Sequence, residues 1–147
     1  MLIAKVRDVK TPTRGTQESA GIDFYVPNDY PESLCTVDPG QRLFIPSGIR
    51  ANVPAGHALI AFNKSGISVN KGFLVGASVV DSDYQGEIHI HLINASSMKQ
   101  TIEPGQKIVQ FLLVPVDHCT IEETTNEELF DEVTERGTGG FGSTGLL

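Results

Sequence analysis

The amino-acid sequence predicts an all-β domain, a β-sandwich or barrel with at most one short helix. Glycine and proline, 15 and 8 among 147 residues, recur at short intervals, which suits many short strands better than helices. Between these breaks, apolar and polar residues alternate, so strands and turns follow one another roughly every 8 to 12 residues. The hydrophobic content of 39% is ordinary for one domain with a real core.

The first strands are short. Residues 2–9 alternate well enough for a strand, and residues 20–26 form another, which carries Asp23. Gly21 would let another backbone approach, so Asp23 is either a strand-end carboxylate or a support for a site. A loop rich in Pro and Asp covers residues 28–40. Three further strands are expected at residues 41–45, 49–53 and 57–62.

Residues 63–68 combine a cation, a hydroxyl and a glycine, in Lys64, Ser65 and Gly66. Such a triplet can bind phosphate oxygens, especially where a helical turn begins with free N–H groups. The same triplet is common in turns, so an ordinary turn remains the alternative.

Residues 72–94 carry the strongest pattern in the chain. A β-branched apolar run meets a polar turn at residues 81–86, and an alternating segment follows, which predicts a β-hairpin. The alternation puts three apolar side chains on one face and two histidines on the other. These are Ile88, Ile90 and Leu92 on the first face, and His89 and His91 on the second.

Asp81 opens that turn directly after the apolar pair Val79-Val80. A carboxylate that is partly desolvated but within reach of water is suited to act as a general base. We therefore take Asp81 as the candidate catalytic residue.

Two other kinds of site are weighed against this one. His89 and His91, two apart on a strand, could ligate a metal as in cupin-type jelly rolls, but the Glu and later His of that pattern are missing, which favours surface or interface histidines. A serine hydrolase is disfavoured because no serine lies in a Gly-x-Ser-x-Gly elbow.

The C-terminal third begins with the most hydrophobic run, residues 107–116, a predicted central strand. Its one polar interior residue, Gln110, must be paired, as a structural hydrogen-bonder or a ligand contact. Residues 120–135 are acidic, with Thr125 and Glu128 in capping-box spacing, and are expected to be a solvated connector with at most one short helix.

The tail, residues 136–145, has five glycines in ten residues. It lacks the Gly-Lys-Ser/Thr ending of a P-loop and the strand-then-helix setting of a Rossmann turn. It is either a flexible terminus or an arm that closes over a ligand. The second interpretation explains four residues that a linker does not need: a phosphate fork, a stacking ring and two hydroxyls. They are Arg136, Phe141, Ser143 and Thr144.

Charge and targeting signals restrict the partners and the compartment. The net charge of −7 argues against non-specific nucleic-acid binding but leaves room for a polyanionic small ligand with a metal ion. Cys35 and Cys119 lie in no metal or redox spacing, so two reduced thiols are expected. Without a signal peptide or an apolar run of membrane length, we expect no membrane partner and a cytoplasmic protein, in the host cell if it is viral.

Five segments, taken together, resemble the trimeric dUTP diphosphatase (dUTPase) family, and their order and spacing span nearly the whole chain. They are Ala20–Phe24, Lys64–Ile67, Val75–Gly86, Gly105–Gln110 and Arg136–Gly145. The resemblance implies a jelly roll over residues 1–135 with a glycine-rich arm at 136–147. It also implies a homotrimer with shared active sites and Mg²⁺-dependent hydrolysis of dUTP to dUMP and pyrophosphate.

The resemblance also implies residue roles. Asp81 would be the base that deprotonates the water attacking the α-phosphorus, and Tyr84 would pack under the deoxyribose and exclude a 2′-hydroxyl. Backbone groups around Ser78, Val79 and His89 would read the uracil edge.

The resemblance further implies contacts to the phosphates and contacts from the arm. It also implies that Mg²⁺ is held by substrate phosphates and water rather than by protein ligands. The phosphate contacts would be Lys64, Ser65, Gly66 and Gln110; the arm contacts would be Arg136, Phe141, Gly142, Ser143 and Thr144; the supporting residues would be Asp23 and Lys107.

The chain departs from the family pattern at four positions. Lys64 and Lys107 stand where Arg is usual, so a point charge replaces a bidentate fork. Ser78 replaces a common Gly, and Asn63 a usual Pro. Two alternatives remain open: a dCTP deaminase-like enzyme on the same fold, and a non-catalytic nucleotide-binding regulatory jelly roll.

Overall fold

The computed structural model describes residues 1–141, 143 and 145, and its secondary structure is mostly β. One short α-helix, α1 (Ser65–Lys71), and one 3₁₀ turn, η1 (Glu32–Leu34), accompany the strands in these residues. The all-β class is therefore confirmed. The strands are β1 (Leu2–Lys5), β2 (Ile22–Tyr25), β3 (Thr36–Val37), β4 (Arg42–Pro46), β5 (Ile49–Asn52), β6 (His57–Asn63), β7 (Phe73–Val75), β8 (Val79–Val80), β9 (His89–Asn94), β10 (Gln100–Thr101) and β11 (Lys107–Pro115).

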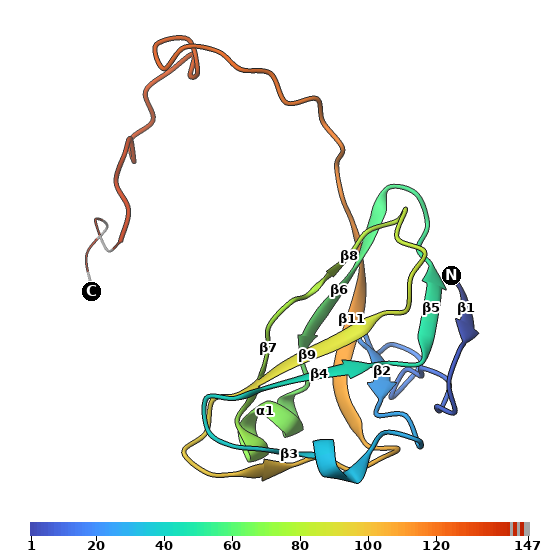
Figure 1. The fold of residues 1–147 in the computed structure, drawn as a ribbon. Helices are drawn as coiled ribbons and strands as arrows, with labels where there is room; N and C mark the ends of the chain where they lie inside the picture. Colours follow the sequence, from blue (N-terminus) through green and yellow to red (C-terminus); the bar gives the residue numbers. More distant parts are fainter. Residues whose placement is uncertain (142, 144, 146–147) are drawn as a thin grey trace. The chain divides into compact units, whose positions relative to one another are not determined.

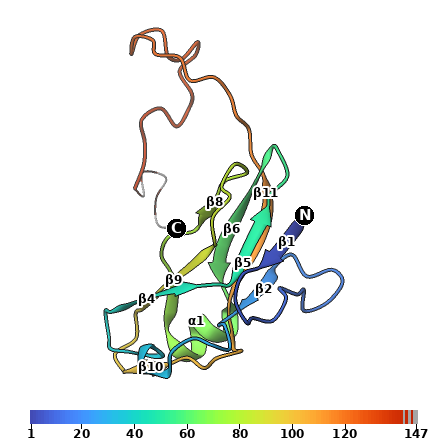
Figure 2. The ribbon, with the colours of Figure 1, turned by 45° about the vertical axis from the view of Figure 1, so that its right-hand side comes forward.

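The chain divides into two units, residues 1–117 and residues 118–147, and all of these strands belong to the first. Within the first unit, a four-stranded antiparallel sheet of order β2-β11-β6-β8 packs against a three-stranded antiparallel sheet of order β4-β9-β7 (Figures 1 and 2). Alternate side chains of both sheets point into one core. Its fully buried members include Phe24, Leu59 and Phe111 from one sheet and Ile45, Ile90 and Leu92 from the other.

The predicted central strand is confirmed. β11 lies between β2 and β6 and pairs with both, so its backbone is bonded on either side. Ile108, Val109 and Phe111 are buried in the core. The predicted faces of β9 are also confirmed, because Ile90 and Leu92 are buried, as is Ile88 just before the strand.

The hairpin predicted for residues 72–94 is only half right. β7 pairs with β9 from Phe73 opposite Asn94 to Val75 opposite Leu92, as expected. Beyond that point the chain leaves β9, and β8 pairs with β6 instead, with Val79 opposite Ile60. The prediction was wrong at the turn end because an alternating pattern defines a strand but not its partner.

Three local features differ from, or sharpen, the predictions. α1 begins inside the Lys64-Ser65-Gly66 triplet, at Ser65, where a helical turn was considered, and it is capped by Gly72, whose φ of 69° is left-handed. The expected loop at 28–40 contributes the short strand β3, which pairs with β10. Residues 120–135 are exposed and contain a turn at residues 126–128 but no helix or strand, as expected of a solvated connector.

No helix in the described residues is long and apolar enough to cross a membrane. Cys35 is buried and Cys119 is exposed, and both are free thiols, as expected.

Candidate functional site

The departure of β8 from β9 opens a cavity of about 240 Å³ between them, which we call the hairpin slot. One wall comes from β8 and the residues beside it, the other from the start of β9. Its lining residues are Phe44, Ala77, Ser78, Val79, Val80, Asp81, Tyr84, Ile88, His89 and Phe111. Five of the predicted site residues, Ser78, Val79, Asp81, Tyr84 and His89, are therefore brought together.

The main-chain groups of Val79 and His89 point into this slot. In an antiparallel strand, the N–H and C=O of one residue point to the same side, and successive residues alternate. The Ser78 carbonyl accepts from Ala61 on β6, so the groups of Val79 face away from β6. The His91 carbonyl accepts from Gly76, so the groups of His89, two residues earlier, also face the side that β8 has left. A flat polar ligand can thus find donors and acceptors on both walls.

Asp81 and Tyr84 stand at the mouth of the slot. Asp81 is exposed, so the partial desolvation expected from its valine neighbours is not seen within this chain. The Tyr84 N–H donates to the Asp81 carbonyl at 3.2 Å, and its Oη donates to the Glu87 carbonyl at 2.8 Å. Both side chains are therefore carried by one turn of residues 81–87.

Sequence reasoning missed Phe44, which also lines the slot. Its ring stacks on the His89 ring, with centroids 4.7 Å apart and planes 10° apart, and it remains 60% exposed. Phe44 occupies an outward position between the buried Leu43 and Ile45. An aromatic residue on the solvent face of an alternating strand was the signal that could have found it.

The two histidines have contacts other than a metal. His89 Nδ1 lies 2.9 Å from the Glu87 carbonyl oxygen, beside the stack on Phe44. His91 Nδ1 accepts the Ala77 N–H at 2.9 Å, which helps to hold the chain where it leaves β9. In the part of the chain that the structure describes, no three His, Cys, Asp or Glu side chains gather as a metal site.

Asp23, Lys64 and Lys107 form a second group, which we call the Asp23 clamp. Lys64 Nζ donates to Asp23 Oδ1 at 2.8 Å, and Lys107 Nζ lies 3.0 Å from Asp23 Oδ2. The Asp23 side chain is only 5% exposed. Burial alone would raise the pKa of this carboxyl, but the bonds from Lys64 and Lys107 outweigh burial and hold the pKa below its usual value. The two unusual lysines thus act on the same acid, one on each oxygen.

The remaining predicted phosphate contacts lie near the clamp rather than in the slot. Ser65 and Gly66 begin α1 directly after Lys64. Gln110 is paired, as expected, because its Nε2 donates to the Asn63 carbonyl at 2.9 Å. A Cβ at Gly21 would overlap the Gln110 amide, so Gly21 makes room for a side chain rather than for the backbone approach that was expected.

The arm residues belong to the second unit of the chain. Arg136 Nε donates to the Gly139 carbonyl at 2.9 Å, and the Ser143 N–H donates to the Gly140 carbonyl at 3.0 Å. The Phe141 side chain is fully exposed. Two further predicted arm contacts, Gly142 and Thr144, lie outside the described residues.

Comparison with known proteins gives a consistent result. A model of the dUTPase family matches residues 7–145. The deoxyuridine 5′-triphosphate nucleotidohydrolase of Chlamydia muridarum is 38% identical over 136 residues, covering 91% of this chain and 90% of the relative. Its counterpart from Hydrogenobaculum sp. is 34% identical over 149 residues, covering 99% of this chain and 98% of the relative.

Solved structures agree on the fold. A Staphylococcus bacteriophage 80alpha dUTPase with dUpNHpp superposes with a TM-score of 0.83 at 20% identity, over 99% of this chain and 98% of that one. A dUTPase from phage phi11 of S. aureus, described with a structural Mg(II) ion, superposes with a TM-score of 0.74 at 17% identity, over 89% of this chain and 98% of that one. The jelly-roll fold is therefore confirmed.

Proposed function

Because this chain belongs to the dUTPase family, we propose that it hydrolyses dUTP to dUMP and pyrophosphate with the help of Mg²⁺, using Asp81 as the base. Such an activity limits uracil in DNA and supplies dUMP. The observation that supports this most is the hairpin slot, where the main chain of Val79 and His89 faces a cavity bordered by Asp81 and Tyr84.

Uracil recognition would rest on main-chain atoms. The N–H and C=O groups that face the slot can pair with the carbonyl and N–H edge of uracil, whatever side chains stand at 78 and 89. Cytosine presents a different edge and would leave buried groups unpaired, a loss that can reach on the order of 10⁴-fold. Thymine has to be excluded by the walls, since a loose apolar pocket separates one methyl by only about 1–3 kcal/mol.

Asp81 would accept a proton from the attacking water. As the water oxygen forms its bond to the α-phosphorus, its proton passes to the Asp81 carboxylate, and the bond from the α-phosphorus to the bridging oxygen breaks to release pyrophosphate. The exposure of Asp81 keeps water within its reach. Tyr84, on the same turn, would pack under the deoxyribose and leave no space for a 2′-hydroxyl.

The triphosphate requires positive charge that the whole protein, at −7, does not provide. We assign the phosphate contacts to Lys64, Ser65, Gly66 and Gln110. An ammonium has three donors, so Lys64 can hold Asp23 and a phosphate oxygen together. Mg²⁺ would be held by the substrate phosphates and by water, because this ion commonly keeps its waters and binds through substrate phosphates rather than a protein cage. When bound, the ion neutralises phosphate charge.

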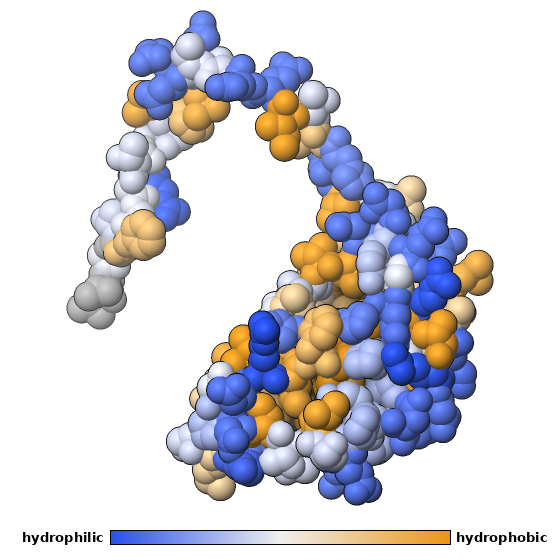
Figure 3. All heavy atoms as spheres, in the orientation of Figure 1, coloured by the Kyte–Doolittle hydropathy of each residue, from blue (hydrophilic) through white to orange (hydrophobic). Residues whose placement is uncertain are grey.

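A homotrimer with shared sites is part of this proposal. The slot carries base and sugar contacts, while the Asp23 clamp and the start of α1 carry phosphate contacts, and none of the latter lines the slot. A site completed between chains would unite the two groups, with the arm closing over the ligand through Arg136, Phe141, Gly142, Ser143 and Thr144. Three residues with exposed apolar side chains, Phe44, Leu74 and Val79, lie on β4, β7 and β8. Figure 3 shows apolar side chains gathered on one face of the first unit, and such a surface suits contact with another copy.

The decisive experiment is pyrophosphate release from dUTP, dTTP, dCTP and UTP, each with and without Mg²⁺. We expect rapid release from dUTP with Mg²⁺ and slow release in every other case. Ammonia release from dCTP would favour a deaminase on this fold instead. Binding of dUTP without turnover would favour a regulatory, non-catalytic protein.

A further inference from the structure

Arg7 and Glu87 have been given no role above, yet Glu87 ends the turn that carries Asp81 and Tyr84, and Arg7 binds the Glu87 carboxylate. We propose that these two side chains are positioning residues that hold the Tyr84 ring where it can exclude a 2′-hydroxyl. This inference rests on the proposed function, because it gives a structural basis to the sugar selectivity assigned to Tyr84.

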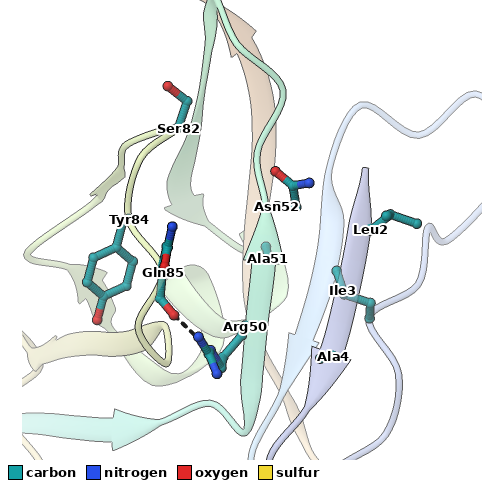
Figure 4. Close-up of a pocket in the computed structure, with 9 residues that line it drawn as sticks. All are labelled: Leu2, Ile3, Ala4, Arg50, Ala51, Asn52, Ser82, Tyr84 and Gln85. Atoms are coloured by element: carbon teal, nitrogen blue, oxygen red, sulfur yellow. Dashed lines mark hydrogen bonds between the residues drawn. The ribbon is translucent and has the colours of Figure 1, made fainter.

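Tyr84 needs such support because open space lies on both of its sides. It lines the hairpin slot, and it also lines a second cavity of about 420 Å³ bordered by β1 and β5 (Figure 4). The residue is 44% exposed. A ring between two cavities has little packing to restrict its rotamers, and ordering it on binding would cost affinity.

The far end of the ring is held by one hydrogen bond. Tyr84 Oη donates to the Glu87 carbonyl at 2.8 Å, three residues along the chain. The phenol reaches this carbonyl by passing over Gly86, where a Cβ would overlap the Tyr84 Oη. The position of the ring therefore depends on the position of Glu87.

Glu87 is in turn anchored to distant parts of the first unit. Its Oε1 accepts Arg7 Nε at 2.7 Å and the Gly48 N–H at 2.8 Å, and its Oε2 accepts Arg7 Nη2 at 3.3 Å. The Glu87 side chain is only 18% exposed. A two-bond contact between a guanidinium and a carboxylate restricts direction as well as distance. Arg7 thus connects the segment after β1 to the turn that carries the proposed base and sugar contact.

Arg50 braces the middle of the same turn independently. Its Nε donates to the Gln85 carbonyl at 2.7 Å (Figure 4). With Gln85 held, loss of the Arg7 contact should displace the Glu87 end and the Tyr84 ring rather than unfold the turn.

The test is the ratio of kcat/KM for dUTP to kcat/KM for UTP in Arg7→Ala, Arg7→Lys and Glu87→Gln. We expect Arg7→Ala to lower this ratio about tenfold, the range expected when one small steric exclusion is lost. Arg7→Lys should lie between Arg7→Ala and the unmodified protein, because a lysine keeps the charge but not the fork. Combining Arg7→Ala with Tyr84→Phe should cost less than the two single effects together, since both act on one ring.

Lys99→Ala is the matched control. It removes an ion pair to Asp38 of 3.1 Å whose side chains are 62% and 63% exposed, so we expect no change in the ratio. A folded Arg7→Ala protein with an unchanged ratio overturns the proposal. If Arg7→Ala does not fold, an unchanged ratio in Glu87→Gln overturns it in the same way. Failure of the unmodified protein to hydrolyse dUTP overturns the proposed function and this inference together, whereas turnover with an unchanged ratio overturns only the inference.

Discussion

At the scale of single residues, what distinguishes the candidate site residues is where they lie in the fold and not which amino acid they are. Asp81 is one of eighteen acidic residues, and what distinguishes it is its place at the mouth of a slot with polar main-chain walls. Asp23 is distinguished by burial and by two lysines. One substitution at each residue tests these positions, Asp81 through the rate of hydrolysis and Asp23 through the stability of the fold.

Asp81→Asn is expected to lower dUTP hydrolysis by at least about 10³-fold while dUTP binding remains measurable. The amide keeps the size of the side chain but does not accept the proton of the attacking water, and general base catalysis contributes about 10²–10⁴-fold. Single-turnover pyrophosphate release, together with calorimetric dUTP binding, checks this. Turnover like that of the unmodified protein would show that another group is the base.

Asp23→Asn is expected to lower the free energy of unfolding at pH 7 by about 1–3 kcal/mol, because a buried charge-assisted contact is lost. The pKa of Asp23 is lower in the folded state than its unfolded value of about 3.9. Its stabilisation is thus complete above the unfolded pKa and is lost as the pH falls through the folded pKa. Urea unfolding at pH 7 and near pH 3 should therefore show a difference from the unmodified protein that narrows in acid. An equal difference at both pH values would contradict the clamp.

At the scale of elements, the site depends on how the segment between β7 and β9 divides itself between two sheets. β7 stays with β9, and β8 joins β6. The division occurs at Gly76 and Ala77, whose N–H groups contact the carbonyl and the ring of His91 respectively. A uniform hairpin would close the slot, so this change of partner creates the cavity.

Gly76→Ala is expected to raise the KM for dUTP about tenfold and to cost about 1–3 kcal/mol of stability, as overpacking does. A Cβ at this position overlaps the His91 ring, which must move and release the Ala77 N–H. Steady-state kinetics and thermal unfolding measure the two effects. Gly15→Ala is the control, because its Cβ would meet only Ser19 Oγ at 3.4 Å. An unchanged KM in Gly76→Ala would show that substrate binding in the slot does not depend on Gly76.

At the scale of the whole molecule, the proposed homotrimer predicts that two inactive variants can restore activity when they assemble together. A protein lacking residues 136–147 should remain a folded trimer with little activity, and so should Asp81→Asn. If each site takes its base and its arm from different chains, refolding the two variants together should restore about a quarter of the activity by random assembly. Kinetics and light scattering on the mixture test this. Full activity of the protein that lacks residues 136–147 would show that the arm has no part in the mechanism. If the refolded mixture recovers no activity, each site takes its base and its arm from the same chain.

The sequence by itself determined the local features of this protein. Alternation of apolar and polar residues was sufficient for the all-β class, for the buried face of β9 and for the central strand β11, because side-chain direction in a strand depends only on neighbouring residues. The five family-like segments identified the family and placed Asp81 and Tyr84 on one turn.

The tertiary structure decided which of these features meet. It joined β8 to β6, brought Lys64 and Lys107 to opposite oxygens of Asp23, stacked Phe44 on His89, and paired Arg7 with Glu87 across 80 residues of chain. Strand partners and distant ion pairs follow from how two sheets cover one core. That arrangement depends on all the strands at once, so no single stretch of sequence contains it.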